Sequence, residues 1–211
     1  MRLPNAVHET RPWRIREIAP DFILEDVWAL PVHGGAGDFP ALLAAMASLD
    51  TAHSGSALTR LLFAVRWALG RWFGWDEAAE RPIPDETEAS LAARLPEDLR
   101  GTVAGLRFGS PFMPLYRTDR EFAAELSNRT VHAVLHLAWA DQGGGRYEGQ
   151  MAVYVKPRGR FGQGYMTLIA PFRHWIVYPE LMRQIGRTWQ ARDKPGLPHG
   201  TSTTVRSAKL F

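Results

Sequence analysis

The chain has 211 residues, of which 45% are hydrophobic and 22% are charged, and its formal net charge is +3. That composition is typical of a globular protein and excludes disordered, collagen-like and coiled-coil chains. It contains no cysteine, which excludes disulfides, thiol chemistry and cysteine-ligated metals. Without an apolar signal core or a run of about 20 apolar residues, we expect a cytoplasmic protein with no transmembrane segment. We expect one domain over residues 1–192 and a loosely held tail over residues 193–211.

The first half of the chain predicts one strand and two helices. Residues 22–31 read FILEDVWALP, which is apolar, β-compatible and ended by a proline, so we expect a strand. After a glycine-rich break, residues 41–49 predict a short helix. Apolar residues at three- and four-residue spacing over 58–73 predict a second helix. Residues 74–111 are acidic and rich in proline and glycine, and predict a long loop whose only regular piece is a short helix over 86–94.

Residues 112–157 alternate with period two and are interrupted by turn residues at 119–120, 128–129 and 143–145. This pattern predicts four antiparallel strands in a meander. A two-residue turn at 128–129 would pair Ala124 with Ala133, and a turn at the glycines would pair Leu135 with Val153. Because directly paired residues point to the same face, these registers collect one wholly apolar face. A turn at 119–120 would pair Arg117 with Phe122 and extend this row with Arg117, Leu115 and Met113.

We expect the apolar face to line a ligand cavity, together with part of the C-terminal helix. The residues predicted to bind the ligand are Asp26, Trp28, Met113, Leu115, Arg117, Phe122, Ala124, Leu135, Leu137, Met151, Val153, Phe172 and Trp175. Asp26 and Arg117 are the charged members of this set. A charge that faces inward needs a partner, so the two either pair with each other, bind a polar group of the ligand, or lie at the solvent edge.

The opposite face of the meander carries the polar side chains. They are Glu121, Glu125, His132, His136, Gln150, Tyr154 and Lys156. The predicted register sets Glu125 against His132 and Glu121 against His136, as ordinary cross-strand charge partners. On a strand, the two histidines would be separated by about 13 Å, which is too far to bind one metal ion, so we expect no metal site.

Apolar residues from Tyr165 to Trp189 recur at helical spacing, which predicts a long amphipathic helix that Pro171 and Pro179 interrupt or kink. The helix needs a large apolar partner, so it should lie across the apolar sheet face. The glycine-rich residues 159–164 before it either cradle an anion or form a mobile connection at the cavity mouth. The earlier run HGGAG predicts a plain turn, because the chain has no G-x-S-x-G nucleophile motif.

Four segments resemble a bacterial family, domain of unknown function 2867: FILEDVWALP, NRTVHAVLHLAW, GQMAVYVKPRG and PFRHWIVYPELMRQIGRTW. With the spacing between them they cover most of residues 11–192. The order of elements is also similar to the helix-grip arrangement of START-like and Bet v 1-like proteins. The resemblance implies an α+β, helix-grip fold, in which a curved antiparallel sheet wraps around the C-terminal helix and encloses a cavity. It implies no catalytic residues.

Two functional hypotheses follow. The first is a binding module for a small apolar, aromatic or lipid-like molecule, without a cofactor. The alternative is an enzyme of hydrolase or cyclase type, in which the Glu and His side chains line the cavity as general acid and base. The orientation of the sheet decides between them. A third and weaker interpretation has the basic C-terminal third meet an anionic membrane or nucleic acid, and we expect no nucleic-acid partner.

Overall fold

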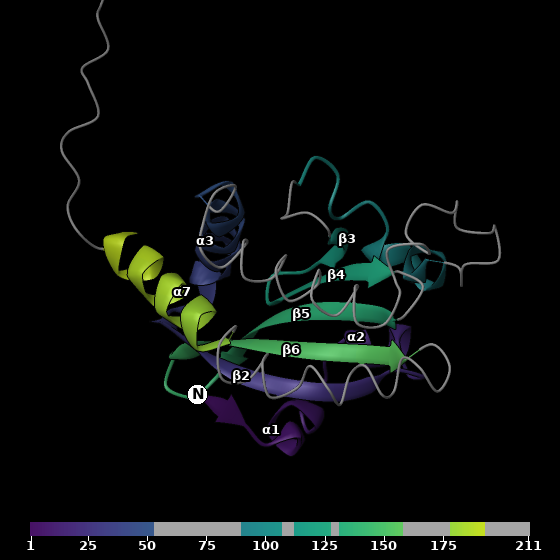
Figure 1. Ribbon diagram of the computed structural model, residues 1–211, viewed down its shortest axis with the longest axis horizontal. Helices are drawn as coiled ribbons and strands as arrows, with labels where there is room; N and C mark the ends of the chain where they lie inside the picture. Colours follow the sequence, from purple (N-terminus) through teal and green to yellow (C-terminus); the bar gives the residue numbers. More distant parts are fainter. Residues whose placement is uncertain (53–89, 107–111, 128–130, 158–177, 193–211) are drawn as a thin grey trace, which may run out of the picture.

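The computed structural model describes residues 1–52, 90–106, 112–127, 131–157 and 178–192, and within them the chain forms a curved, open antiparallel sheet (Figure 1). The strands are β1 (Arg2–Leu3), β2 (Ile23–Gly34), β3 (Met113–Arg117), β4 (Glu121–Ser127), β5 (Val131–Asp141) and β6 (Tyr147–Pro157). Their order across the sheet is β1-β2-β6-β5-β4-β3. The predicted α+β class and the four-stranded meander are therefore confirmed.

Short helices surround this sheet in the described part of the chain. They are α1 (Asn5–Glu9), α2 (Ile15–Ile18), α3 (Phe39–Ala52) and α7 (Tyr178–Arg192), with single 3-10 turns η1 (Ala36–Asp38), η2 (Leu91–Arg94) and η3 (Glu97–Leu99). The helix predicted over 41–49 is confirmed as α3, and the one predicted over 86–94 is only the turn η2 in its described part. Three predicted segments lie outside the described residues. They are the helix over 58–73, the first part of the C-terminal helix and the tail 193–211.

The meander registers follow the prediction in one hairpin and shift in the other. Between β5 and β6, Leu135 lies opposite Val153 as predicted. Between β4 and β5, Ala124 lies opposite Leu135 rather than Ala133. The last pair before the connection is Ser127 and His132, so the predicted two-residue turn was too short. A shift of two residues keeps every side chain on its predicted face.

Strand β3 departs from the prediction because its register is irregular between Pro114 and Tyr116. Arg117 lies opposite Phe122 as predicted, but Met113 lies opposite Glu125. An extra residue in one strand turns the side chains beyond it to the other face. Leu115 accordingly packs in the core on the polar side of the sheet. The prediction that Met113 and Leu115 continue the apolar row was wrong.

The sheet carries a core on each face. On the first face, which we call the helix face, Trp28, Phe122, Leu137 and Met151 pack with residues of α3 and α7. On the second, which we call the arm face, Val134, Ala152 and Tyr154 pack with residues of α2, η2 and η3, and the His8 ring of α1 lies 6.0 Å from that of Tyr154. The N-terminal arm, residues 1–18, and the turns η2 and η3 therefore cover the face that carries the glutamates and histidines.

We predict that Gly149→Ala destabilises the protein by about 1–3 kcal/mol through overpacking. Gly149 lies on β6 beside the irregular part of β2, and an added Cβ would run into the Val32 side chain and lie 3.2 Å from Leu30 Cδ1. The control is Gly37→Ala, because nothing lies within 4 Å of a Cβ at that position. Urea unfolding of both variants measures the difference, and equal stabilities would contradict the close packing of β2 on β6.

Candidate functional site

The helix face brings together most of the side chains that the sequence predicted for a ligand site. Those on it are Asp26, Trp28, Phe122, Ala124, Leu135, Leu137, Met151 and Val153. Helix α7 packs against β2 and α3, at one end of the strands (Figure 1). Its side chains Met182, Ile185 and Trp189 contribute to the core there. The helix face therefore meets α7 at one end of the strands, and the predicted long helix across the whole face stays a prediction.

Burial differs along the helix face. Phe122, Ala124 and Leu137 are fully buried, whereas Leu135 and Val153, which lie opposite each other on β5 and β6, are only half-buried. Both pack against the core of the helix face. Val153 also packs against Val131 and Val155. Large apolar side chains that stay partly accessible in the middle of a sheet face offer a surface that an apolar ligand can cover.

Asp26 is the buried charge on the helix face, with none of its surface exposed. It lies opposite Val153 on β6. Its carboxylate accepts a hydrogen bond from the Tyr178 hydroxyl at 3.4 Å and lies 3.3 Å from the Arg2 guanidinium. These two donors compensate part of the cost of removing a carboxylate from water.

The pairing of Asp26 with Arg117 that the sequence allowed is wrong. Arg117 is on β3, and β6, β5 and β4 lie between β3 and β2. At about 4.8 Å per strand, the two backbones are separated by roughly 19 Å. Arg117 is half-buried at the edge of the sheet, where its backbone N–H donates to Thr102 Oγ1 at 3.0 Å.

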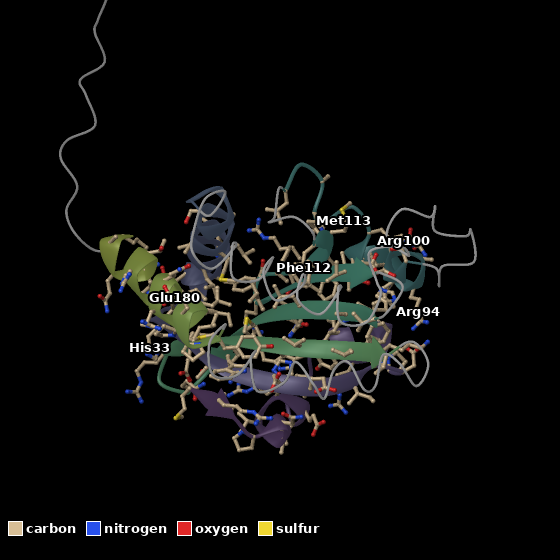
Figure 2. All side chains as sticks on the ribbon, in the orientation of Figure 1. His33, Arg94, Arg100, Phe112, Met113 and Glu180 are labelled. Carbon is tan, nitrogen blue, oxygen red and sulfur yellow. The ribbon has the colours of Figure 1, made fainter. Side chains whose placement is uncertain are left out.

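The remaining predicted residues lie elsewhere. Met113 is 67% exposed on the edge strand β3, far from α7 (Figure 2). Leu115 belongs to the arm face, and Phe172 and Trp175 lie outside the described residues. The sequence analysis missed Tyr178, whose ring lies 4.9 Å from that of Trp28. Its position at the start of a helix, immediately before Pro179, was a usable signal.

The arm face holds the glutamate and histidine side chains in two buried pairs. His132 Nε2 lies 2.8 Å from Glu125 Oε2, and His136 Nε2 lies 3.1 Å from Glu121 Oε2. The predicted partners are thus confirmed, although each pair lies diagonally across the strands instead of directly opposite. All four side chains are at least nine-tenths buried. The sequence predicted ordinary cross-strand charge partners. In the structure, the four side chains instead form part of a buried core.

Glu125 accepts several hydrogen bonds in this core. Ser90 Oγ donates to one oxygen, and the Leu91 N–H and His132 contact the other. Burial alone would raise the pKa of Glu125, but these hydrogen bonds favour the charged form more strongly, so its pKa lies below the ordinary value. Glu125 therefore attaches the segment that begins η2 to the sheet.

Glu121 holds the N-terminal arm in the same way. Its Oε2 accepts hydrogen bonds from the Arg14 N–H at 2.9 Å, the Tyr116 hydroxyl at 3.0 Å and His136. Burial and the nearby Glu121 charge raise the pKa of Tyr116 far above its ordinary value. Tyr116 is consequently a permanent phenol donor to this carboxylate.

His8 on α1 completes the buried polar group. Its Nδ1 lies 3.4 Å from Gln150 Oε1, and its ring centroid lies 5.1 Å from that of His136. Burial, followed by repulsion from His136, lowers the pKa of His8 to about 3. The imidazole is neutral across the physiological range.

The described ranges meet neither the requirements of a metal site nor those of a membrane-spanning helix. They contain no group of three or more His, Asp or Glu side chains arranged to hold a metal ion. None of the helices within those ranges combines the length and hydropathy needed to cross a bilayer.

With an open antiparallel sheet covered by helices on one face and by the arm on the other, the chain falls in the α+β class. Over residues 18–180 it matches the model of a family of proteins of unknown function, DUF2867. The chain belongs to this family. The matched range contains the predicted ligand residues as well as both Glu–His pairs, and it begins at the last residue of α2. No curated protein and no solved structure matches the chain.

We predict that stability falls as the pH is lowered from 7 to 5, in part through His8. The unfolded histidine has a pKa near 6.5 and the folded one a pKa of about 3. The unfolded state therefore binds more protons in this window, and the free energy of unfolding falls by up to about 1.4 kcal/mol per pH unit. His8→Gln should flatten this slope in urea titrations at several pH values.

His33→Gln is the matched control, because His33 is exposed on β2. It should leave the slope as it is in the unmodified protein. A slope that His8→Gln does not change would mean that His8 is protonated in the folded state.

Proposed function

We propose that this protein binds a small apolar or aromatic molecule between the helix face of the sheet and the C-terminal helix. The helix-grip arrangement, within one domain over residues 1–192, is part of the proposal. It is supported by the position of α7 against the apolar side of the sheet. The lack of cysteine also fits a cytoplasmic location, and the proposal requires no cofactor and no nucleic acid.

The observation that carries the proposal is the buried carboxylate of Asp26 on an otherwise apolar wall. Ligand pockets combine apolar side chains with a few polar groups that fix the orientation of the ligand. Asp26 lies opposite the half-buried Val153, and Tyr178 and Arg2 contact it. The Arg2 side chain is 54% exposed, so its guanidinium can stay in water when a ligand donor takes its place at the Asp26 carboxylate. The ligand class that fits is an apolar or aromatic molecule with one hydroxyl or amine donor.

The arrangement favours binding over the hydrolase or cyclase alternative. That alternative needs the Glu and His side chains on the side of the sheet that faces the C-terminal helix. They lie on the arm face instead, and the arm and η2 engage them through hydrogen bonds. Both predicted Glu–His pairs therefore have a structural role in holding these segments to the sheet.

A fluorescence titration with N-phenyl-1-naphthylamine, which is uncharged and carries one N–H donor, tests the proposal. The unmodified protein should bind the probe and enhance its emission. Leu135→Trp should weaken binding by about 10-fold or more, because it fills the half-buried part of the helix face. Asp26→Asn should also weaken binding, by several-fold, since an amide is a weaker acceptor than a carboxylate.

The matched control is Val7→Trp, which adds a tryptophan on α1, where Val7 is 36% exposed. It should bind the probe as the unmodified protein does. Native mass spectrometry of purified protein should in addition detect a co-purifying apolar compound. Failure to bind the probe, together with the absence of any co-purifying compound, would contradict the proposal, as would equal affinities of Leu135→Trp and Val7→Trp.

A further inference from the structure

A separate hollow lies where the N-terminal arm crosses the end of the sheet. Its volume is about 320 Å³. It is lined by Arg11, Pro12 and Trp13 of the arm, by Thr118, Asp119, Arg120 and Glu121 around the β3–β4 turn, and by Trp139 and Asp141 at the end of β5. None of the residues predicted to bind a ligand on the helix face lines it. A site here would be independent of the proposed function.

Glu121 lines the hollow with one carboxylate oxygen still able to accept. All three hydrogen bonds to this side chain, from Arg14, Tyr116 and His136, end on Oε2. Among the described residues nothing donates to Oε1. Because a carboxylate oxygen has two lone pairs and a high desolvation cost, Oε1 is a strong acceptor for a ligand N–H or O–H group.

A second polar group of the hollow also has no partner in the described part of the chain. Trp13 is 8% exposed, and its buried indole Nε1 makes no hydrogen bond there. Buried donors almost always find an acceptor. Trp13 therefore places an aromatic ring with an unsatisfied indole N–H among the residues that line the hollow with Glu121.

Charges of both signs surround these two groups. Arg11 and Arg120 are cationic, and Asp119 and Asp141 are anionic. Arg11 donates to the Asp141 carbonyl at 2.9 Å, which ties the arm to β5 across the hollow. Arg120 is exposed and forms no ion pair within the described ranges, so its guanidinium is available to an anionic group at the entrance.

We propose that this hollow is a binding site for a small zwitterion of amino-acid size. The ammonium group donates to Glu121 Oε1, and the carboxylate pairs with Arg120 at the rim, near Arg11. Trp13 provides an aromatic wall. His136 and Tyr116 are positioning residues, because they fix Glu121 through Oε2 and leave Oε1 directed to the ligand.

Saturation-transfer difference NMR of the full chain with each of the twenty free L-amino acids tests this site. At least one amino acid should bind. Its N-acetyl derivative and its methyl ester should each bind about 10-fold more weakly, because the first removes the cation opposite Glu121 and the second the anion opposite Arg120. If no amino acid binds, or if binding survives both modifications, the proposal is wrong.

Arg120→Gln is the decisive variant, because Arg120 is exposed and its loss does not disturb the core. It should weaken binding of the selected amino acid by about 10-fold. The control Arg183→Gln removes a guanidinium whose side chain is 62% exposed on α7, and should have no effect. Equal binding by these two variants would overturn the site.

Glu121→Gln should abolish binding, but it can also loosen the arm, so its melting temperature is measured alongside. Leu135→Trp distinguishes this site from the proposed apolar site. It should leave amino-acid binding unchanged while it weakens binding of N-phenyl-1-naphthylamine. If Leu135→Trp weakens binding of both the amino acid and N-phenyl-1-naphthylamine, the two ligands share one site.

Discussion

The carboxylate of Glu121 joins three parts of the molecule. It lies on β4, it bonds to Tyr116 on β3 and to His136 on β5, and it accepts the Arg14 N–H of the arm. A buried carboxylate is tolerated only when donors surround it. The Arg14 N–H is the arm's own hydrogen bond to this carboxylate, whereas the bonds from Tyr116 and His136 come from within the sheet. Glu121 therefore fixes where the arm lies on the sheet, and apolar side chains such as Ile15 and Ile18 complete the cover.

The arm and η2 pack on one face of the sheet, whereas α3 and α7 pack on the other at one end of the strands (Figure 1). The two faces have different chemistry. The helix face is apolar with one buried carboxylate, whereas the arm face mixes apolar side chains with paired glutamates and histidines. The two proposed sites differ accordingly, one for an apolar molecule and one for a zwitterion at the margin of the polar core.

The sequence supported the meander, its faces and the β5–β6 register, because period-two alternation and a glycine turn are local signals. The irregularity at Leu115 was missed because Met113, Leu115 and Arg117 continue the alternation, although Pro114 within the strand was a signal of an edge or a bulge. The short strand and helices of the N-terminal arm were also not predicted. A two-residue strand and helices of five and four residues are too short for periodicity to show.

The candidate site was recovered in part for the same physical reasons. Residues whose place follows from strand register, such as Leu135 and Val153, were assigned to the correct face. The partners of Asp26 could not be predicted from the sequence, because Arg2 and Tyr178 reach it from distant parts of the chain. The burial of Glu121 and His136 was likewise set by a cover that is remote in sequence, so their polar pattern looked like that of a solvated face.

The irregular strand β3 also affects how copies of this protein meet. An open sheet offers its edge strands for pairing with another chain, and a long regular edge promotes association. Here one edge is the two-residue β1. The other is β3, where Pro114 lacks an N–H and the register breaks before Tyr116. The β3 edge therefore lacks a continuous row of donors and acceptors, so the bulge that moves Leu115 off the helix face also hinders the pairing of this edge with a neighbouring chain.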